Sequence, residues 1–235
     1  MIAEMVKKWC LENKQTITEQ QLAMFKQYAG LLREWNEKMN LTAITDDEGI
    51  AVRHFIDSIS ILNSQAIPDG AKVIDIGTGA GFPGIPVKIM RPDVELYLLD
   101  SLNKRLIFLE EVCGQLGFQA QLIHSRAEDS ARQEEYREQF DVVVSRAVAN
   151  LPALCEYCLP YVKVGGIFIA MKGPDGENEL AQSEKAFNIL GGKVENILHT
   201  VLPDQSQRTI ICLKKTAETP ARYPRKGTKI NKNPL

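Results

Sequence analysis

A glycine-rich segment that directly follows an apolar run carries the clearest chemical signal in this sequence. Val73–Ile76 leads into Gly77, Gly79 and Gly81, and a helical pattern begins behind them. Glycines after a strand let the backbone turn sharply and approach a ligand without a Cβ in the way. Asp100 ends the next apolar run, 19 residues beyond Gly81, where a carboxylate can accept hydrogen bonds from both hydroxyls of a ribose. Together these features predict a cofactor that contains a nucleoside.

Two cofactors compete for this segment. The glycine spacing formally satisfies the G-x-G-x-x-G fingerprint of dinucleotide-binding proteins, so NAD is one candidate. Pro83 and Pro86, however, lie where a pyrophosphate needs free backbone N–H groups at the helix start. Asp75, before the first glycine, suits a cationic cofactor without phosphate. The segment therefore favours S-adenosylmethionine, whose ammonium and sulfonium groups attract carboxylates.

Three further polar residues at predicted strand ends are candidates for function. Glu128 and Asp129 follow the third predicted strand, where they serve either as helix-cap carboxylates or as ligands of the cofactor. Arg146 ends the fourth predicted strand, and an arginine there more often has a functional role than a structural one. His54 is expected to be a hydrogen-bonded structural histidine.

The cysteines and histidines do not predict a metal site. Five cysteines, an odd number, are read as reduced thiols. Cys155 and Cys158 share one face of a predicted helix, which favours core packing. The three histidines are scattered along the chain and offer little to a zinc ion.

The first third of the chain has helical periodicity. Thr18 and Gln21 form a capping box, followed by an apolar stripe about five turns long. Thr45 and Glu48 repeat the pattern and predict the start of a second helix. Two aromatic residues fall on these stripes and are expected in the core: Trp35 and Phe55.

Beyond Pro68, short apolar runs alternate with helical stretches, which predicts an α/β fold with a parallel, doubly wound sheet. The last two strands have no helix between them and should form an antiparallel hairpin. The strands are expected at Lys72–Ile76, Glu95–Leu99, Gln121–His124, Asp141–Ser145, Gly166–Met171, Lys193–Leu198 and Thr209–Lys214. The helices are expected near Gly84–Met90, Lys104–Leu116, Ser130–Gln139, Leu151–Leu159 and Asn178–Leu190.

The charge is unevenly distributed over the 235 residues. The chain has a net charge of −2, but Lys214–Leu235 carries seven basic residues and one acid, a net +6, so the remainder carries −8. Basic arms of this kind often contact nucleic acid, although composition alone favours a solvated terminus. The first 15 residues lack the apolar core of a signal peptide. With no apolar stretch of the ~20 residues needed by a membrane helix, we expect a cytoplasmic protein without membrane contact.

The segment from Val73 to Pro86, Val-Ile-Asp-Ile-Gly-Thr-Gly-Ala-Gly-Phe-Pro-Gly-Ile-Pro, resembles the RsmG (GidB) family of bacterial 16S rRNA guanine-N7 methyltransferases. The Gly-Phe-Pro-Gly extension is more specific than the glycine triplet. The chain departs from the family pattern at Lys229, where a proline is expected. The likeness continues through Trp35-Asn36, Asn40–Ile44, Arg53–Phe55, Asp57-Ser58, Arg126–Glu128, Ser145–Ala147, Lys172-Gly173 and Arg208.

This resemblance implies a Rossmann-like, seven-stranded S-adenosylmethionine-dependent methyltransferase sheet with an N-terminal helical cap. Three parts of one compact domain are expected: the cap at residues 1–66, the core at 67–214 and a basic tail at 215–235. Gly79 and Asp100 join the expected cofactor site on the spacing argument above. The resemblance itself implies cofactor contacts from Gly77, Phe82, Ala127, Glu128 and Arg146.

The implied activity is methyl transfer to N7 of a guanine in 16S rRNA, which in the family is guanine 527 of the 530 loop near the decoding site. The partner would be 16S rRNA, the small ribosomal subunit or its assembly intermediate, and the protein a monomer. Ser145-Arg146-Ala147 stands where amine methyltransferases of this fold carry an Asn/Asp-Pro-Pro-aromatic loop. Guanine N7 presents an in-plane lone pair, so we assign no catalytic acid or base.

Other functions remain open at the level of sequence. The first alternative is a methyltransferase acting on a small metabolite, and the others are an NAD-dependent oxidoreductase and a non-catalytic, cofactor-sensing RNA binder. Cations near the predicted cleft and in the tail favour RNA, because phosphates need positive charge. The RNA-binding candidates are Arg53, Lys172, Arg208, Arg222, Arg225 and Lys226.

Overall fold

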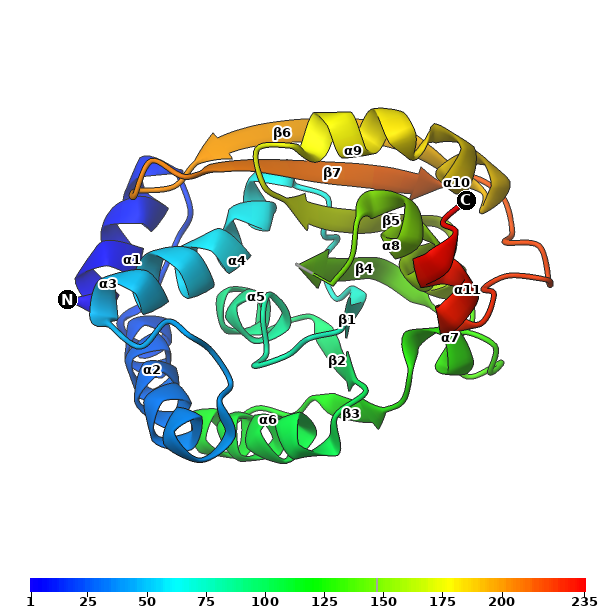
Figure 1. Ribbon diagram of the computed structural model, residues 1–235. Coiled ribbons are helices and arrows are strands. Elements are labelled where there is room, and N and C mark those ends of the chain that lie inside the picture. Colours follow the sequence, from blue (N-terminus) through cyan, green and yellow to red (C-terminus); the bar gives the residue numbers. More distant parts are fainter. Residues whose placement is uncertain (147) are drawn as a thin grey trace.

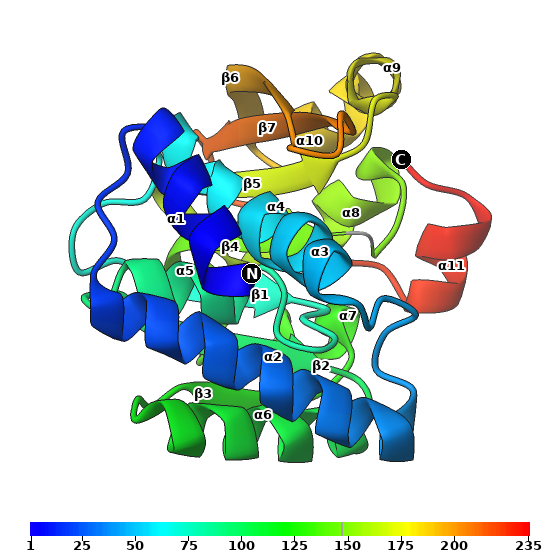
Figure 2. The same cartoon turned by 90° about the vertical axis from the view of Figure 1, so that its left-hand side faces the viewer.

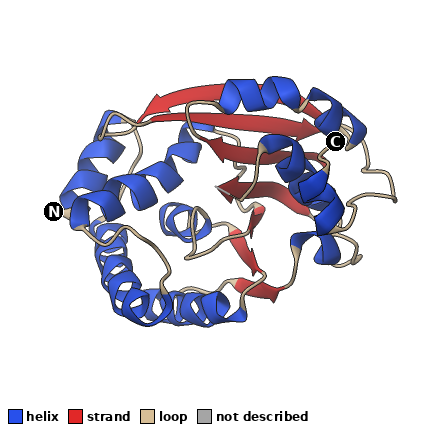
Figure 3. Cartoon of the chain, viewed as in Figure 1, coloured by secondary structure: helices blue, strands red, loops and turns tan. Residues whose placement is uncertain are grey.

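A single seven-stranded sheet organises the protein (Figures 1 and 3). The structure, a computed structural model, describes residues 1–146 and 148–235, so Ala147 of the Ser145-Arg146-Ala147 motif lies outside the described residues. The strand order is β3-β2-β1-β4-β5-β7-β6, with β7 antiparallel to both β5 and β6. The strands are β1 (Lys72–Ile76), β2 (Glu95–Asp100), β3 (Gln121–His124), β4 (Phe140–Arg146), β5 (Val162–Lys172), β6 (Gly192–Val201) and β7 (Gln207–Lys215).

Alternate residues of the central strands enter two different cores. In β4, Val142 and Val144 pack into one core and Val143 into the other, and all three are fully buried. Successive side chains of a strand point to opposite faces, so a continuous apolar run suits a sheet covered on both sides. The first core lies under α5 (Gly84–Met90), α6 (Asn103–Leu116) and the cap helices. The second lies under α8 (Leu151–Cys158), α10 (Glu184–Ile189) and α11 (Gly227–Lys232).

The N-terminal cap is built from helices that pack against α5 and α6. The capping box of α2 (Glu19–Met39) is confirmed, with Gln21 N donating to Thr18 Oγ1 at 3.2 Å. In Figure 2, α2 runs alongside α6, and Trp35 meets Phe108 with ring centroids 5.7 Å apart. The cap also contains α1 (Ile2–Glu12), α3 (Asp47–Gly49), a π-helical stretch (Ile50–Ile56), α4 (Asp57–Ile59) and a 3₁₀ turn (Ser60–Ser64).

Three local predictions are wrong. Asp46, not Thr45, caps α3, because its Oδ1 accepts a hydrogen bond from Gly49 N at 2.7 Å. The helix expected at Ser130–Gln139 ends early: α7 spans Ala127–Ser130, and turns follow up to Glu138, which adopts a left-handed conformation with φ of 56°. The helix expected at Asn178–Leu190 is broken at Ser183, which separates α9 (Gly176–Gln182) from α10.

The basic tail packs against the protein body rather than extending into solvent, as Figure 1 shows for the red segment beside α7 and α8. Tyr223 and Ile230 belong to the second core. Arg225 donates hydrogen bonds to both carboxylate oxygens of Glu156, whose side chain is fully buried. The prediction of a frayed terminus, which composition favoured, is therefore wrong, because a buried acid and apolar contacts hold this segment.

None of the described helices is both long and apolar enough to cross a bilayer.

The Arg225–Glu156 pair generates a prediction for stability. Replacing Arg225 with alanine leaves the Glu156 carboxylate buried without its charged partner, so we expect a loss of about 3–5 kcal/mol in the free energy of unfolding. Chemical denaturation measures this loss. Arg222→Ala, at an exposed position in the same segment, is the matched control and should change stability by less than about 0.5 kcal/mol. Equal, small losses in the two variants would contradict a role for the ion pair.

Candidate functional site

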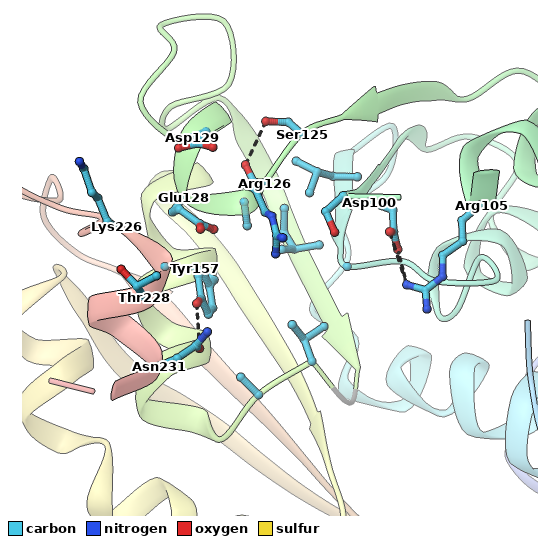
Figure 4. A pocket seen from close by; sticks show the side chains of 18 residues that line it. Asp100, Arg105, Ser125, Arg126, Glu128, Asp129, Tyr157, Lys226, Thr228 and Asn231 are labelled. Carbon is cyan, nitrogen blue, oxygen red and sulfur yellow. Dashed lines mark hydrogen bonds and ion pairs between the residues drawn. The ribbon is translucent and has the colours of Figure 1, made fainter. Parts of the chain in front are cut away.

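A cavity of about 750 Å³ opens at the carboxyl ends of β1, β2 and β3. This is the edge of a parallel sheet where ligands bind, beside the switch in strand order between β1 and β4. Figure 4 shows its polar walls, which come from the strand ends, from α7 and α8, and from α11. The lining residues whose side chains or backbones matter below are Gly77, Asp100, Arg105, Arg126, Ala127, Glu128, Asp129, Tyr157, Lys226, Gly227, Thr228 and Asn231.

Gly77 forms the floor of this cavity in a conformation that side chains rarely adopt. Its φ is 70°, and its N–H donates to Leu99 O of β2 at 2.9 Å. A Cβ at this position would lie 2.6 Å from Cγ2 of Val148, which also lines the cavity. Both the backbone angle and the space therefore require glycine here.

Asp100 connects the glycine segment to the end of β2. Its carboxylate accepts hydrogen bonds from Gly79 N and Leu102 N, both at 2.9 Å, and lies 3.2 Å from Arg105 Nη1. The residue is 2% exposed and lines the cavity. Gly77 and Asp100, both predicted for the cofactor site, thus line the same cavity. Gly79, also predicted, lies in the loop and donates its N–H to the Asp100 carboxylate. A carboxylate at this place suits the hydroxyls of a ribose.

Asp75 supports the glycine segment from below and is absent from the cavity lining that the structure describes. Its Oδ2 accepts hydrogen bonds from Thr78 Oγ1 and Gly84 N, both at 2.8 Å, so one carboxylate holds both ends of the loop. Its Oδ1 is buried and has no hydrogen-bond partner among the described residues. Burial raises the pKa of this carboxyl to about 7. The structure therefore gives Asp75 a place under the loop rather than facing a cofactor.

The segment after β3 supplies the far wall. Ala127 and Glu128, for which the resemblance implied cofactor contact, line the cavity, and Asp129 lies beside them. Tyr161 fixes this short helix by donating to Ala127 O at 2.6 Å. Several lining residues were not among the predicted site residues: Arg105, Arg126, Tyr157, Gly227, Thr228 and Asn231. Lys226 was expected to bind RNA, and it lines this same cavity.

Phe82 and Arg146 lie together in a neighbouring cluster rather than among the lining residues of the cavity. The Phe82 and His54 rings stack with centroids 4.5 Å apart, and the Arg146 guanidinium lies 5.0 Å from the Phe82 centroid. Arg146 also pairs with Asp57 at 3.1 Å. Burial, and then the charge of Arg146, lower the pKa of His54 to about 4, so this ring is neutral at pH 7. Contact of Phe82 and Arg146 with the cofactor stays a prediction.

Most of the cations predicted to bind RNA have partners within the chain. Arg53 pairs with Asp204 at 2.8 Å, and Arg208 pairs with Asp57 at 2.9 Å. Lys172 donates to Ala149 O and pairs with Glu179 at 2.8 Å. Arg225 is held by Glu156, as described above. Arg53, Arg222 and Lys226 are the exposed members of the set.

The thiols and potential metal ligands add no further chemistry to the cavity. All five cysteines are buried free thiols, as expected for Cys155 and Cys158, and burial raises the pKa of both groups above the usual thiol range. Among the described residues, no group of three or more histidine, cysteine or acidic side chains is arranged to hold a metal ion.

The sheet order, the glycine turn after β1 and the carboxylate at the end of β2 define a Rossmann-like S-adenosylmethionine-dependent methyltransferase. A putative methyltransferase from Bacillus halodurans superposes with a TM-score of 0.54 at 13% identity, covering 69% of this chain and all of the other. An S-adenosylmethionine-dependent methyltransferase from Aquifex aeolicus gives 0.51 at 16% identity, covering 67% and 89%. These distant likenesses concern the fold.

Sequence comparison identifies the family. Residues 21–211 match the GidB family, described as rRNA small subunit methyltransferase G, and the chain belongs to this family. Two relatives carry the name ribosomal RNA small subunit methyltransferase G. The one from Clostridium kluyveri is 54% identical over 90% of this chain and 89% of its own length. The one from Acetivibrio thermocellus is 53% identical over 93% and 90%. S-adenosylmethionine is accordingly the cofactor, as the glycine segment indicated.

Gly77 offers a direct test of the cofactor site. Gly77→Val should abolish binding of S-adenosylhomocysteine, because the new side chain would fill the cavity floor and collide with Val148. Isothermal titration calorimetry measures the affinity. Gly70→Val is the matched control, since Gly70 has a similar φ of 66° but open space around its Cβ position and no place in the cavity. Loss of binding in both variants would assign the effect to backbone strain instead.

The buried carboxyl of Asp75 predicts a pH dependence. Its folded pKa of about 7 exceeds the unfolded value of 3.8, so the folded state binds the extra proton between these values. This contribution to stability is complete below about pH 4 and is lost as the pH rises through 7. Relative to Asp75→Asn, the wild type should lose at most about 1.4 kcal/mol per pH unit over this window. Denaturation at several pH values measures it, and parallel profiles would contradict a raised pKa.

Proposed function

We propose that this chain transfers the methyl group of S-adenosylmethionine to N7 of a guanine in 16S rRNA, the family position being guanine 527. The observation that carries the proposal is the identity of about half the residues, over about nine-tenths of both chains, with relatives named ribosomal RNA small subunit methyltransferase G. A cytoplasmic, monomeric enzyme that acts on 16S rRNA, on the small subunit or on its assembly intermediate belongs to the same proposal.

The cavity suits the cofactor in shape and charge. Gly77 leaves the floor free of a side chain, Asp100 offers a carboxylate for the ribose, and the segment carrying Ala127 and Glu128 forms the far wall. When bound, S-adenosylmethionine supplies an electrophilic methyl group on a sulfonium. The chain's own task is then to bind this cofactor and to orient the accepting base.

Methylation at guanine N7 fits the side chains that surround the site. N7 bears a lone pair in the plane of the neutral base, so the acceptor needs no proton removed from it. His54, the histidine of the Phe82 cluster, is neutral at pH 7, and the buried Cys155 and Cys158 have raised pKa values unsuited to a thiolate nucleophile. Alignment of the reacting atoms can account for about 7–11 kcal/mol of the barrier. The described residues thus support a mechanism of positioning.

The acceptor side of the site is proposed to lie at the Phe82–Arg146 cluster. Phe82 belongs to the same loop as Gly77, and Arg146 ends β4, the strand beside β1. Aromatic and guanidinium planes are the groups on which an exposed base stacks. Arg53 and Arg208 flank this cluster through Asp204 and Asp57, and their cations are proposed to meet RNA phosphates there.

The test is transfer of labelled methyl groups to RNA. We expect the protein to label unmethylated 16S rRNA, naked or within the small subunit, and borohydride–aniline cleavage to map the label to N7 of guanine 527. The two substrate forms, assayed in parallel, identify the natural target. Gly77→Val serves as the negative control, because it removes the cofactor site and leaves the RNA-facing residues in place.

Other results would redirect the proposal. Label confined to a small molecule added from a cell extract would support the metabolite methyltransferase instead. Label on a guanine amine or on a pyrimidine would contradict N7 transfer while leaving RNA methylation intact. Cofactor binding without transfer to either form of 16S rRNA would contradict the enzymatic function.

A further inference from the structure

The C-terminal segment forms one wall of the cofactor cavity. Lys226, Gly227, Thr228 and Asn231 line the cavity together with residues of β1, β2 and α7. Figure 4 shows Thr228 and Asn231 on the helix that faces Glu128 and Tyr157. Tyr157 donates from its hydroxyl to Asn231 Oδ1 at 3.0 Å, which fixes the orientation of this wall.

Gly227 lies directly against the Glu128 carboxylate. A Cβ at Gly227 would lie 2.1 Å from Glu128 Oε1 and 2.9 Å from its Cδ. The glycine occupies the first turn of α11, and its φ is outside the left-handed region, so the backbone itself accepts any side chain. Glycine at this position therefore leaves room for the Glu128 carboxylate; the backbone of the turn does not require it.

The same stretch of chain that carries Glu128 also holds the C-terminal segment. Arg137, which follows α7, donates to Tyr223 O at 2.9 Å and to Thr219 O at 2.7 Å, and Arg132 donates to Pro224 O. The buried Glu156 of α8 holds Arg225. Three anchors, two in the turns after α7 and one on α8, thus fix the segment against the cavity, so its position and that of Glu128 are set together.

Strand order indicates which end of the cofactor meets this wall. Asp100 of β2 suits the ribose, and the Phe82–Arg146 cluster lies on the β4 side, where the methyl group must face the acceptor. The base of the cofactor then extends the other way, toward β3, α7 and α11. Adenine presents an exocyclic amine that donates hydrogen bonds, and the Glu128 carboxylate is an acceptor on that side.

We propose that residues 225–231 are a built-in part of the adenine site, with Gly227 as a positioning residue that keeps the Glu128 carboxylate where it accepts from the adenine amine, and with Thr228 and Asn231 completing the wall. The inference rests on the cofactor of the proposed function and is independent of its RNA target. The basic tail, whose charge was one argument for RNA contact, thereby contributes to cofactor affinity.

The experiment compares two ligands that differ in the adenine amine. S-adenosylhomocysteine has this amine, and S-inosylhomocysteine has a carbonyl in its place. We expect Gly227→Ala to lower the affinity for the first by about tenfold, the effect of one hydrogen bond to a charged group. Affinity for the inosyl compound should stay unchanged. Gly114→Ala, at a glycine with open space around it and outside the cavity, is the matched control.

A double-variant cycle separates positioning from general damage to the fold. In a Glu128→Ala background, Gly227→Ala should have no further effect on either ligand, because the carboxylate it displaces is gone. Thermal denaturation should show the same melting temperature for Gly227→Ala and the wild type, since the colliding atom is the end of a flexible side chain. If Gly227→Ala does not fold, Thr228→Val tests the same wall with an isosteric change, and we expect weaker S-adenosylhomocysteine binding.

Three results would overturn the inference. These are wild-type affinity of a folded Gly227→Ala variant, equal losses for the adenosyl and inosyl compounds, and, where Thr228→Val must be used, unchanged binding in that variant. Each of these leaves the proposed function standing, because the cofactor still binds the wild type. A wild type that binds no S-adenosylhomocysteine contradicts both, whereas cofactor binding without RNA methylation contradicts only the proposed function.

Discussion

The site depends on how the loop after β1 is held, and two buried carboxylates hold it. Asp75 accepts from Thr78 and Gly84 at the two ends of the loop, and Asp100 accepts from Gly79 in its middle. With these bonds in place Gly77 faces the cavity and Phe82 faces the cap, so the cavity and the Phe82–Arg146 cluster are two sides of one turn. Each carboxylate gains its role from burial, because in low dielectric a hydrogen bond to backbone N–H is strong and its absence is costly.

In the Phe82–Arg146 cluster, too, a buried carboxylate holds the surrounding groups in place. Asp57 is buried, and its two carboxylate oxygens pair with different arginines, one with Arg146 and the other with Arg208. This one carboxylate therefore links β4, β7 and the cap. Because Arg146 is paired, it stays in place above Phe82, where its charge adds to burial in lowering the pKa of His54. An arginine already oriented by a carboxylate loses less side-chain entropy when a base or phosphate arrives. The paired cations are thus compatible with RNA contact, and Arg53, the most exposed of them, has the weakest hold in its own chain.

The sheet and the glycine loop follow from local sequence, whereas the far wall of the cavity does not. Apolar runs such as Val142–Val144 predict buried strands because burial on both faces admits few polar residues, and all seven strands lie where those runs indicated. The capping box at Thr18 is equally local. By contrast, the π-helical stretch at Ile50–Ile56, the early end of α7 and the docking of the tail depend on contacts with residues distant in sequence. The site residues that were not predicted include Asn231, which lies in the docked tail, and Tyr157 of α8, which donates a hydrogen bond to it.

The uneven charge of the sequence has a structural explanation in the same contacts. The net positive segment from Lys214 onward meets acids of the negative body: Arg225 meets Glu156, and Lys215, which is fully buried, lies 3.0 Å from Glu138. Composition cannot distinguish a basic tail that binds a polyanion from one whose charges pair with acids of the same chain, because both tails have the same net charge. The distinction requires the burial of the acids, and a fully buried Glu156 would destabilise the fold without its arginine. These ion pairs therefore account for part of the charge asymmetry by holding the tail against the body, whereas Arg222 and Lys226 keep their charges at exposed positions.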